Sequence, residues 1–197
     1  MSPSPDTLAP ETFAQVRLDT PRLCVRTPDV EDLDDLLSIY AHPDIARYGT
    51  HAPWTDLDEA RAWLERAESG HTSASALTLV LEDRATQHVI GTCVLFSLHA
   101  ESRRAEIGYT LHREHWGRGL MHEALTAFIG HAFEAMKLRR IEADIDPANA
   151  ASRRVLERQG FVHEGRLRER WCVGGQVTDT DLYGLLHHEW RRPDVDA

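Results

Sequence analysis

Apolar residues recur along this 197-residue chain with two periods, and the period predicts which segments are strands and which are helices. Seven runs alternate or are continuously apolar and contain many branched or aromatic side chains, which is typical of strands. Short polar turns join the second run to the third and the sixth to the seventh, and so predict two hairpins. The seven runs are 17–27, 77–81, 89–98, 105–111, 138–145, 161–171 and 177–186.

Four other segments carry apolar residues three and four positions apart, which predicts amphipathic helices. Asp29 is placed to cap the first helix and Thr55 or Asp56 the second, which Gly70 closes. The order of strands and helices predicts an α+β fold with a mixed, mostly antiparallel, twisted sheet flanked by helices. The predicted helices span 29–40, 55–70, 120–136 and 149–159.

The length of the chain bounds its domain organisation. A chain of 197 residues is long enough for one well-cored domain and short for two, so we expect a single domain over residues 17–192. Residues 1–16 have neither the basic region nor the apolar core of a secretory signal and are expected to form a flexible tail. No apolar run is long enough to span a bilayer, so no membrane partner is expected.

Cysteine and histidine positions bear on metal binding and on the compartment. The three cysteines, Cys24, Cys93 and Cys172, form no CxxC pair and no metal-ligand spacing. Scattered cysteines in odd number fit free thiols in a reducing environment, which predicts a cytoplasmic protein. The histidines at 112, 115 and 122 also lack the spacing of a known metal site, so we expect no metal ion.

Charge is distributed unevenly along the chain, whose net charge is −10. Residues 1–100 hold 7 basic and 16 acidic side chains, whereas residues 101–197 hold 15 and 16. The acidic half suits a cationic amine or a basic peptide through long-range attraction, although an acidic surface that only keeps the protein in solution has the same composition. The acidity of the whole chain argues against a nucleic-acid partner.

The most informative stretch of the chain is 105–162. Its first strand leads to a Gly-x-Gly turn at Gly117 and Gly119 and then to a helix, and its second strand leads to a Pro-x-Asn-x-x-Ser segment that ends at Ser152. A glycine-rich turn at the start of a helix suits an anion, because free backbone N–H groups and the helix dipole face it and glycine lets a phosphate come close. The turn lacks the Gly-Lys-Ser/Thr of a P-loop and the third glycine of a dinucleotide-binding fingerprint.

This order of motifs resembles the acetyl-CoA-dependent N-acetyltransferases of the GNAT superfamily. Within it the chain resembles the Rim-type branch, whose members acetylate N-terminal amines of ribosomal proteins or small amines. Glu114 stands where the superfamily often has glutamine or arginine, and Met121 where a small residue is common, but neither departure changes the backbone of the turn. The segments that match the branch, over nearly the whole chain, are LDTPRLCVRTP, EIGYTL, HWGRGLMHEAL, NAASRRVLERQGF and DLYGLLHHEW.

The resemblance implies the GNAT fold, in which two central strands splay apart and the pantetheine arm of acetyl-CoA pairs with the exposed backbone like an added strand. It also implies that Asn149 contacts the pantetheine arm and that one or two of Arg153, Arg154 and Arg158, first of all Arg154 and Arg153, contact the 3′-phosphate. From the residues alone, a helix cap at Asn149 and arginines on a solvated helix face explain the same positions. The residues that the resemblance places around the pyrophosphate are Trp116, Gly117, Arg118, Gly119, Leu120 and Met121.

Acetyl transfer to an amine needs a neutral amine, a polarised thioester carbonyl and a proton for the departing thiolate. An N-terminal amine, with a pKa of about 7.7–8.0, is partly neutral at pH 7, whereas a lysine amine with a pKa of about 10.4 needs more help. The resemblance implies that Ser152 protonates the thiolate or donates a hydrogen bond to it. Glu106, on the strand before the glycine turn, is our first candidate for the base. Its rivals are Tyr109, His112, Glu142, Asp144 and Glu169.

We therefore expect an enzyme that transfers an acetyl group directly from acetyl-CoA to a primary amine, which is a protein N-terminus or a small molecule. No GxSxG or Cys-His pair indicates a covalent enzyme intermediate. Two alternatives stay open: a non-catalytic module that binds or senses acyl-CoA, and transfer of another acyl group such as succinyl. From the resemblance alone we also expect a homodimer, with the C-terminal hairpin as its contact.

The acceptor pocket is expected in the variable parts of the chain, which are segment 28–70 and the hairpin around Trp171. Aromatic residues are frequent there, although burial in the core is the commoner place for such residues. The aromatic residues of segment 28–70 that we expect in this pocket are Tyr40, Tyr48, Trp54 and Trp63.

Overall fold

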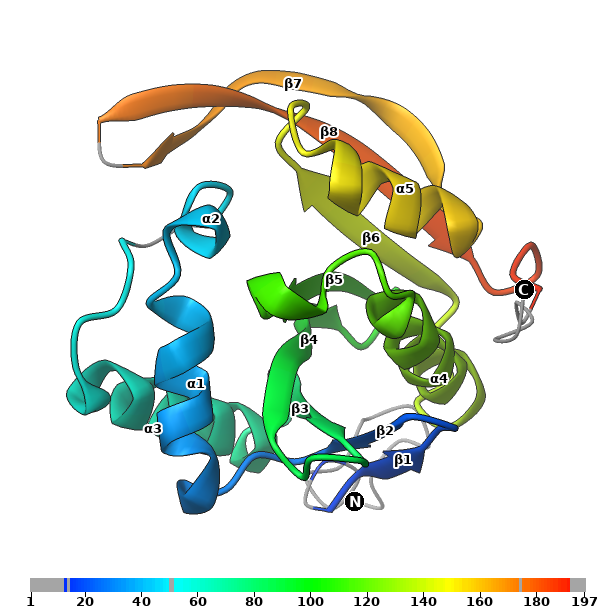
Figure 1. Ribbon diagram of the computed structural model, residues 1–197. Helices are drawn as coiled ribbons and strands as arrows, with labels where there is room; N and C mark the ends of the chain where they lie inside the picture. The colour runs from blue at the N-terminus through cyan, green and yellow to red at the C-terminus, as the bar shows by residue number, and fades with distance from the viewer. Residues whose placement is uncertain (1–12, 14, 50–51, 174, 192–197) are drawn as a thin grey trace.

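One continuous sheet of eight strands runs through the computed structural model, which describes residues 13, 15–49, 52–173 and 175–191 (Figure 1). The strands lie in the order β1-β2-β3-β4-β5-β6-β8-β7, and every neighbouring pair is antiparallel except β5 and β6. The predicted mixed, mostly antiparallel sheet is thereby confirmed. The strands are β1 (Arg17–Asp19), β2 (Leu23–Arg26), β3 (Leu77–Asp83), β4 (Val89–His99), β5 (Arg104–Leu111), β6 (Arg140–Ile145), β7 (Val162–Val173) and β8 (Gln176–Leu186).

Helices cover both faces of the sheet, with α1 and α3 on one face and α4 and α5 on the other (Figure 1). Asp29 caps a short 3₁₀ helix before α1, and the Asp56 side chain accepts hydrogen bonds from the N–H groups of Asp58 and Glu59 at the start of α3, as the sequence predicts. The helices are α1 (Leu33–Tyr40), α2 (Pro43–Ala46), α3 (Leu57–Thr72), α4 (Leu120–Glu134) and α5 (Ala150–Arg158).

Alternation along the strands divides the apolar residues between two cores. In β3, Leu79 and Leu81 pack in the larger core with α4, whereas Val80 packs in the smaller core with α1 and α3. Phe128 of α4 is completely buried in the larger core, and burial of such a side chain stabilises the fold by about 1.5–3 kcal/mol. The two cores hold the sheet between its helical layers and so make it a firm base for a site on its central strands.

The N-terminal region differs from the prediction in two ways. The predicted strand 17–27 is broken into β1 and β2, because the chain turns at Pro21 with a hydrogen bond from the Thr20 N–H to the Leu23 carbonyl. Phe13 and Val16, placed by the sequence in a flexible tail, are buried in the larger core because their apolar side chains pack there. Residues 1–12 and 14 of the predicted tail, and residue 192, lie outside the described residues.

The parallel pair β5 and β6 separates partway along its length. Their pairing extends only from Arg104 opposite Arg140 to Glu106 opposite Glu142. Beyond Glu106, β5 continues to Leu111 paired with β4 alone, and β6 continues to Ile145 paired with β8 alone. The splayed central strands that the resemblance implies are therefore present, and they leave one side of β5 open within the sheet.

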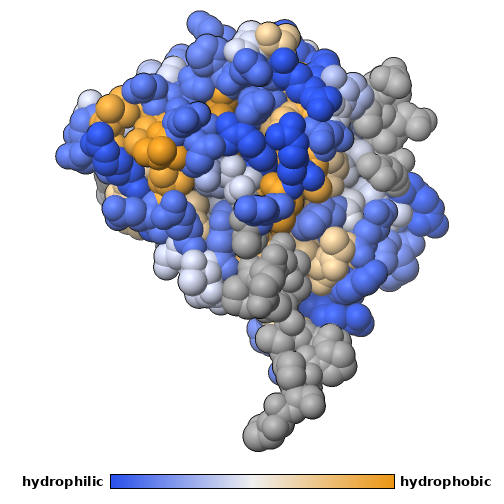
Figure 2. All heavy atoms as spheres, turned by 90° about the horizontal axis from the view of Figure 1, so that it is seen from below, coloured by the Kyte–Doolittle hydropathy of each residue, from blue (hydrophilic) through white to orange (hydrophobic). Residues whose placement is uncertain are grey.

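The molecular surface is largely polar on the face shown in Figure 2, where hydrophilic side chains predominate and apolar ones form small separate groups. Among the described residues, no helix is both long and apolar enough to cross a membrane. The same residues include no cluster of three or more His, Cys, Asp or Glu side chains that is suited to a metal ion.

Candidate active site

A cleft of about 1280 Å³ opens where β5 and β6 separate. One wall consists of the sheet, from β4, β5 and β6, and the start of α5. The other walls come from α1, α3 and the segment between them, and from the tip of the β7–β8 hairpin. Segment 28–70 and the hairpin around Trp171, which the sequence predicts for an acceptor pocket, therefore both contribute to the cleft.

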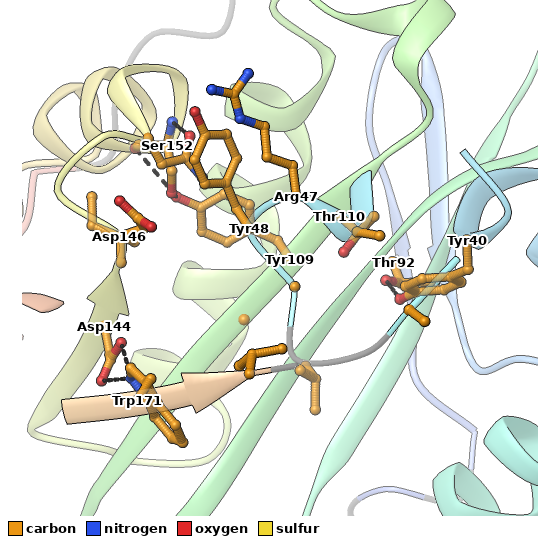
Figure 3. Close-up of a pocket in the computed structure, with 18 of the residues that line it drawn as sticks. Tyr40, Arg47, Tyr48, Thr92, Tyr109, Thr110, Asp144, Asp146, Ser152 and Trp171 are labelled. Atoms are coloured by element: carbon orange, nitrogen blue, oxygen red, sulfur yellow. Dashed lines mark hydrogen bonds between the residues drawn. The ribbon is translucent and has the colours of Figure 1, made fainter. Parts of the chain in front are cut away.

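Ser152 and Tyr109 form a hydrogen-bonded pair in this cleft, with 2.6 Å between the Tyr109 hydroxyl and the Ser152 Oγ (Figure 3). The Ser152 N–H is bound by the Oδ1 of Asn149, the residue that caps α5, at 3.0 Å. The cap therefore uses the backbone of Ser152, and its hydroxyl is left for other chemistry. Burial raises the pKa of Tyr109, so this hydroxyl stays protonated near neutral pH and is unsuited to be a base.

The candidate carboxylates differ in how they are paired. Glu142 accepts hydrogen bonds from Arg104 and Arg140, each at 2.8 Å. Asp144 accepts hydrogen bonds from Trp171 and Thr180. Glu106 lines the cleft, and within the described part of the chain its carboxylate has no hydrogen-bond or ion-pair partner. Glu106 is thus the carboxylate most available to accept a proton.

Two other predicted base candidates lie away from the cleft. His112 does not line it, and its Nδ1 accepts a hydrogen bond from the Glu114 N–H. Glu169 is an exposed residue of β7 and does not line it either. The structure therefore brings Glu106, Asp144 and Tyr109 of the predicted base candidates into one site.

The Gly-x-Gly turn lies at the N-terminus of α4, beyond the end of β5 and outside the lining of the cleft. Both glycines have φ of 74°, a left-handed conformation that favours glycine. A Cβ on Gly117 would meet no atom within 4 Å, so the surface above this turn is open to a bound group. An open turn at the start of a 15-residue helix fits a pyrophosphate, since the first backbone N–H groups of a helix lack partners within it.

The side chains next to the turn are placed in three ways. Leu120 and Met121 are buried in the core, so only their backbone N–H groups face a ligand at this helix end. Trp116 donates from Nε1 to the Leu111 carbonyl at 2.6 Å and so ties the turn to the end of β5. Arg118 is exposed, and its guanidinium contacts His115 Nδ1 at 3.2 Å.

Two of the three arginines of α5, Arg153 and Arg154, differ in their contacts. The guanidinium of Arg153 donates to the Pro147 carbonyl at 2.8 Å and lies 3.7 Å from Asp181. Arg154 is exposed, and no described residue forms an ion pair or hydrogen bond with its side chain. Of the two, Arg154 is the one available to a phosphate.

Two residues that support the turn were not predicted. Arg22, in the turn between β1 and β2, donates to the Arg118 carbonyl at 2.9 Å, and its Nε donates to the buried Glu123 of α4 at 2.6 Å. These partners are about a hundred positions away in the sequence, so neither hydrophobic period nor motif spacing carries a signal for them.

The predicted aromatic residues all line the cleft, and some also belong to the smaller core. Tyr40 stacks on Trp54 with 4.4 Å between ring centroids, and its hydroxyl lies 2.7 Å from the Thr92 Oγ1. Tyr48 and Trp171 are more exposed. The Trp171 Nε1 donates to the Asp144 carboxylate, at the lower left of Figure 3 and on the opposite side of the picture from Tyr40. The aromatic side chains of the cleft are therefore buried near α1 and exposed near Tyr48 and the hairpin.

Comparison with known proteins places these features in one family. A family model described as acetyltransferase (GNAT) domain matches residues 22–162. The chain is 34% identical to the uncharacterized N-acetyltransferase p20 of Bacillus licheniformis, over 88% of this chain and 97% of that protein. It is 30% identical to the [ribosomal protein uS5]-alanine N-acetyltransferase of Escherichia coli (strain K12), over 89% of this chain and 93% of that enzyme.

A solved structure has the same fold. RimJ of Mycobacterium smegmatis, in complex with CoA-disulfide, superposes with a TM-score of 0.80. The match covers 92% of this chain and 91% of that one, at 22% sequence identity.

Proposed function

The chain belongs to the GNAT acetyltransferase family, and from this premise we propose that Ser152 and Glu106 serve acetyl transfer from acetyl-CoA to a primary amine in the cleft between β5 and β6. The observation that carries the proposal is the convergence of three features in one cleft: the open side of β5, the Ser152 hydroxyl and the Glu106 carboxylate, which no described residue pairs. The family is one of N-acetyltransferases, so the alternative of a non-catalytic binding module is not favoured.

On the donor side, the chain offers separate groups for the phosphates and for the arm of a long anionic molecule. The Gly-x-Gly turn and the N-terminus of α4 would hold the pyrophosphate, and Arg154 the 3′-phosphate. Asn149 would contact the pantetheine arm where it passes the open side of β5. When bound, acetyl-CoA supplies the acetyl thioester, and the chain positions it by these contacts.

On the chemical side, the chain's own residues handle two protons. Glu106 accepts a proton from the incoming ammonium group, which leaves the amine neutral and nucleophilic. The amine nitrogen forms a bond to the acetyl carbon as the carbon–sulfur bond breaks, and the second proton of the nitrogen passes to the departing sulfur, so that the products are a neutral amide and the CoA thiol. Ser152 relays this proton, because its hydroxyl gives a proton to the sulfur and takes one from the nitrogen. The Tyr109 hydroxyl, which stays protonated, lies 2.6 Å from the Ser152 Oγ and orients it through their hydrogen bond.

We propose a protein N-terminus as the acceptor. The ribosomal-protein alanine N-acetyltransferase among the relatives supports this class. An N-terminal amine has a pKa of about 7.7–8.0, so a single carboxylate such as Glu106 suffices to deprotonate it near neutral pH. The open end of the cleft near Tyr48 and Trp171 leaves room for the rest of a peptide.

The experiment that tests this function is CoA thiol release from acetyl-CoA with matched peptides. One peptide begins with a free alanine and lacks lysine, the second has the same sequence with an acetylated N-terminus, and the third is acetylated and contains one lysine. We expect thiol release with the first peptide alone. Release with the lysine peptide, or with small amines and no peptide, would contradict the acceptor class.

A further inference from the structure

The turn between β1 and β2 reaches across the larger core to the start of α4, beneath which these two strands lie in Figure 1. Glu123, in the first turn of α4, is 1% exposed, and its carboxylate accepts hydrogen bonds from three groups of this turn. They are the Thr20 hydroxyl at 2.6 Å, the Arg22 N–H at 2.8 Å and the Arg22 Nε at 2.6 Å. A buried carboxylate at the N-terminal end of a helix is also stabilised by the helix dipole.

The guanidinium of Arg22 contacts both Glu123 and the glycine turn. Its Nη1 donates to the carbonyl of Arg118, the residue between the two glycines, at 2.9 Å. Its Nη2 lies 3.6 Å from the position that a Cβ on Gly119 would take, and in the described part of the chain no group accepts a hydrogen bond from this atom. Arg22 therefore fixes the middle carbonyl of the Gly-x-Gly turn, that of Arg118, and its Nη2 offers N–H groups that no described residue accepts.

The two glycines explain why the turn needs a side chain that holds it in place. A turn with two left-handed glycines has more backbone freedom than other loops when it is unrestrained, and that freedom is lost when a ligand orders it. A turn that is held in its final conformation before binding avoids this cost, which raises affinity without adding a contact.

We propose that Arg22 is a positioning residue that holds the Gly-x-Gly turn ready for the pyrophosphate of CoA, with Glu123 as its anchor. The inference rests on the proposed acetyl-CoA site. Arg22 acts on the pyrophosphate end of the donor alone, because its contacts reach the turn and α4 and none of the residues that line the cleft.

The test compares ligands that carry the pyrophosphate with one that lacks it. Calorimetry measures the Kd of CoA and of dephospho-CoA, which keeps the pyrophosphate and lacks the 3′-phosphate. Steady-state kinetics measure kcat/KM for S-acetylpantetheine, which has neither group. For Arg22→Gln we expect both Kd values to rise at least about tenfold and by the same factor, with kcat/KM for S-acetylpantetheine unchanged. A loss shared by all three ligands would show a general defect in folding and overturn the proposal, as would unchanged Kd values.

Three further variants sharpen the test. Arg22→Lys keeps the charge without the planar group that reaches Glu123 and Arg118 together, so we expect it to bind CoA nearly as weakly as Arg22→Gln; full affinity would mean that charge alone matters and would overturn the proposal. If Arg22→Gln fails to fold, Glu123→Gln takes its place, and we expect it to raise the Kd of CoA and of dephospho-CoA by the same factor. Arg17→Gln, which removes an exposed arginine of β1 paired with Asp19, should leave every value unchanged.

The outcome is separable from that of the proposed function. The CoA and dephospho-CoA measurements need no turnover, and where the protein releases no thiol with any amine, the Kd of S-acetylpantetheine replaces its kcat/KM as the control. A wild-type protein that turns over and an Arg22→Gln variant with unchanged Kd values would leave the proposed function intact and refute this inference alone.

Discussion

At the scale of single residues, the environment of each polar group separates structural from chemical roles. Serine at position 152 is explained by helix capping when only the sequence is considered, but the cap uses the Ser152 N–H and the Asn149 side chain. The Ser152 hydroxyl points instead to Tyr109, in a cleft. Likewise, Glu142 is neutralised by two arginines, whereas Glu106 has no such partner among the described residues.

Replacement of Ser152 by alanine should therefore affect turnover and not folding. We expect kcat to fall about 100-fold, the size of effect typical of a lost proton donor, while the Kd of CoA and the melting temperature stay the same. Turnover is measured by thiol release, with Tyr109→Phe as the matched variant. Since Tyr109→Phe removes only the hydrogen bond that orients Ser152, its loss should be smaller, about tenfold. Unchanged turnover in Ser152→Ala would remove the serine from the mechanism.

Glu106→Gln should give a loss that depends on pH. Near pH 7 the base is needed because most of an N-terminal amine is protonated, and we expect kcat/KM to fall about 10- to 100-fold. Above the amine's pKa of about 8, the neutral amine predominates in solution and the difference from wild type should shrink. The pH profile of kcat/KM with a free-alanine peptide measures this. Asp179→Asn, which removes another carboxylate that lines the cleft, is the control, and a loss independent of pH would contradict the role as base.

At the scale of elements, the sequence predicts most helices and strands because their apolar periods persist over several turns. The helix caps at Asp29, Asp56 and Asn149 and both hairpins are confirmed. The failures are local: strand 17–27 is broken at a turn, and α2 is a four-residue helix inside a segment without a period. Short elements carry too few residues for a period to be visible, and tertiary contacts decide them.

The sequence predicts those parts of the candidate site that lie in contiguous motifs, and it does not predict contacts between distant segments. The glycine turn, Asn149 and Ser152 belong to contiguous patterns whose chemistry follows from helix N-termini. The pairing of Ser152 with Tyr109 joins residues 43 positions apart, and that of Arg22 with Glu123 joins residues 101 positions apart. Such contacts depend on how the strands are ordered in the sheet, and one sequence alone does not contain that information.

Asn149 links element stability to donor binding, and two substitutions separate these roles. Asn149→Ala removes the cap of α5, which we expect to cost about 1 kcal/mol and to lower Tm by about 3 °C. Asn149→Asp keeps an acceptor for the Ser152 N–H and should restore Tm. Both variants lack the amide N–H group that would contact the pantetheine arm, so we expect a higher KM for acetyl-CoA than that of wild type in Asn149→Ala and in Asn149→Asp alike. Thermal unfolding and steady-state kinetics measure the two effects, and a normal KM in Asn149→Asp would argue that the cap is the only role of Asn149.

At the scale of the whole molecule, ion-paired carboxylates tie distant elements together, and two of them, Glu123 and Asp181, are buried. Hydrogen bonds from Arg166 lower the pKa of Asp181, and burial opposes this effect. Arg140 lowers the pKa of Glu164 in the same way. For Glu123, burial raises the pKa, but the hydrogen bonds from Thr20 and Arg22 outweigh it, so the pKa is lowered. The folded protein therefore favours the ionised form of all three carboxylates.

Stability should consequently fall in acid. A carboxylate whose pKa is lowered by folding contributes stability above its unfolded pKa, about 4, and loses it as the pH falls through the lower folded value. Asp181→Asn should cost about 2 kcal/mol at pH 7 through its lost charged hydrogen bonds. Its unfolding free energy should also decline less steeply than that of wild type below pH 5. Urea unfolding between pH 7 and pH 2 measures both quantities. If the unfolding free energies of wild type and Asp181→Asn decline in parallel with pH, Asp181 is not among the groups whose titration destabilises the protein.

The β7–β8 hairpin has a consequence for how such a protein changes over evolutionary time. Nearly every residue of β7 is exposed, yet the hairpin carries Trp171 into the wall of the cleft. Surface substitutions away from caps, buried pairs and special backbone conformations usually change stability by less than about 0.5 kcal/mol. Mutations along this strand that spare the ion-paired Glu164 and Arg166 can therefore accumulate and reshape this wall of the cleft while the glycine turn and both cores are left untouched. The fold thus allows acceptor preference to diverge between descendants that all keep the same donor.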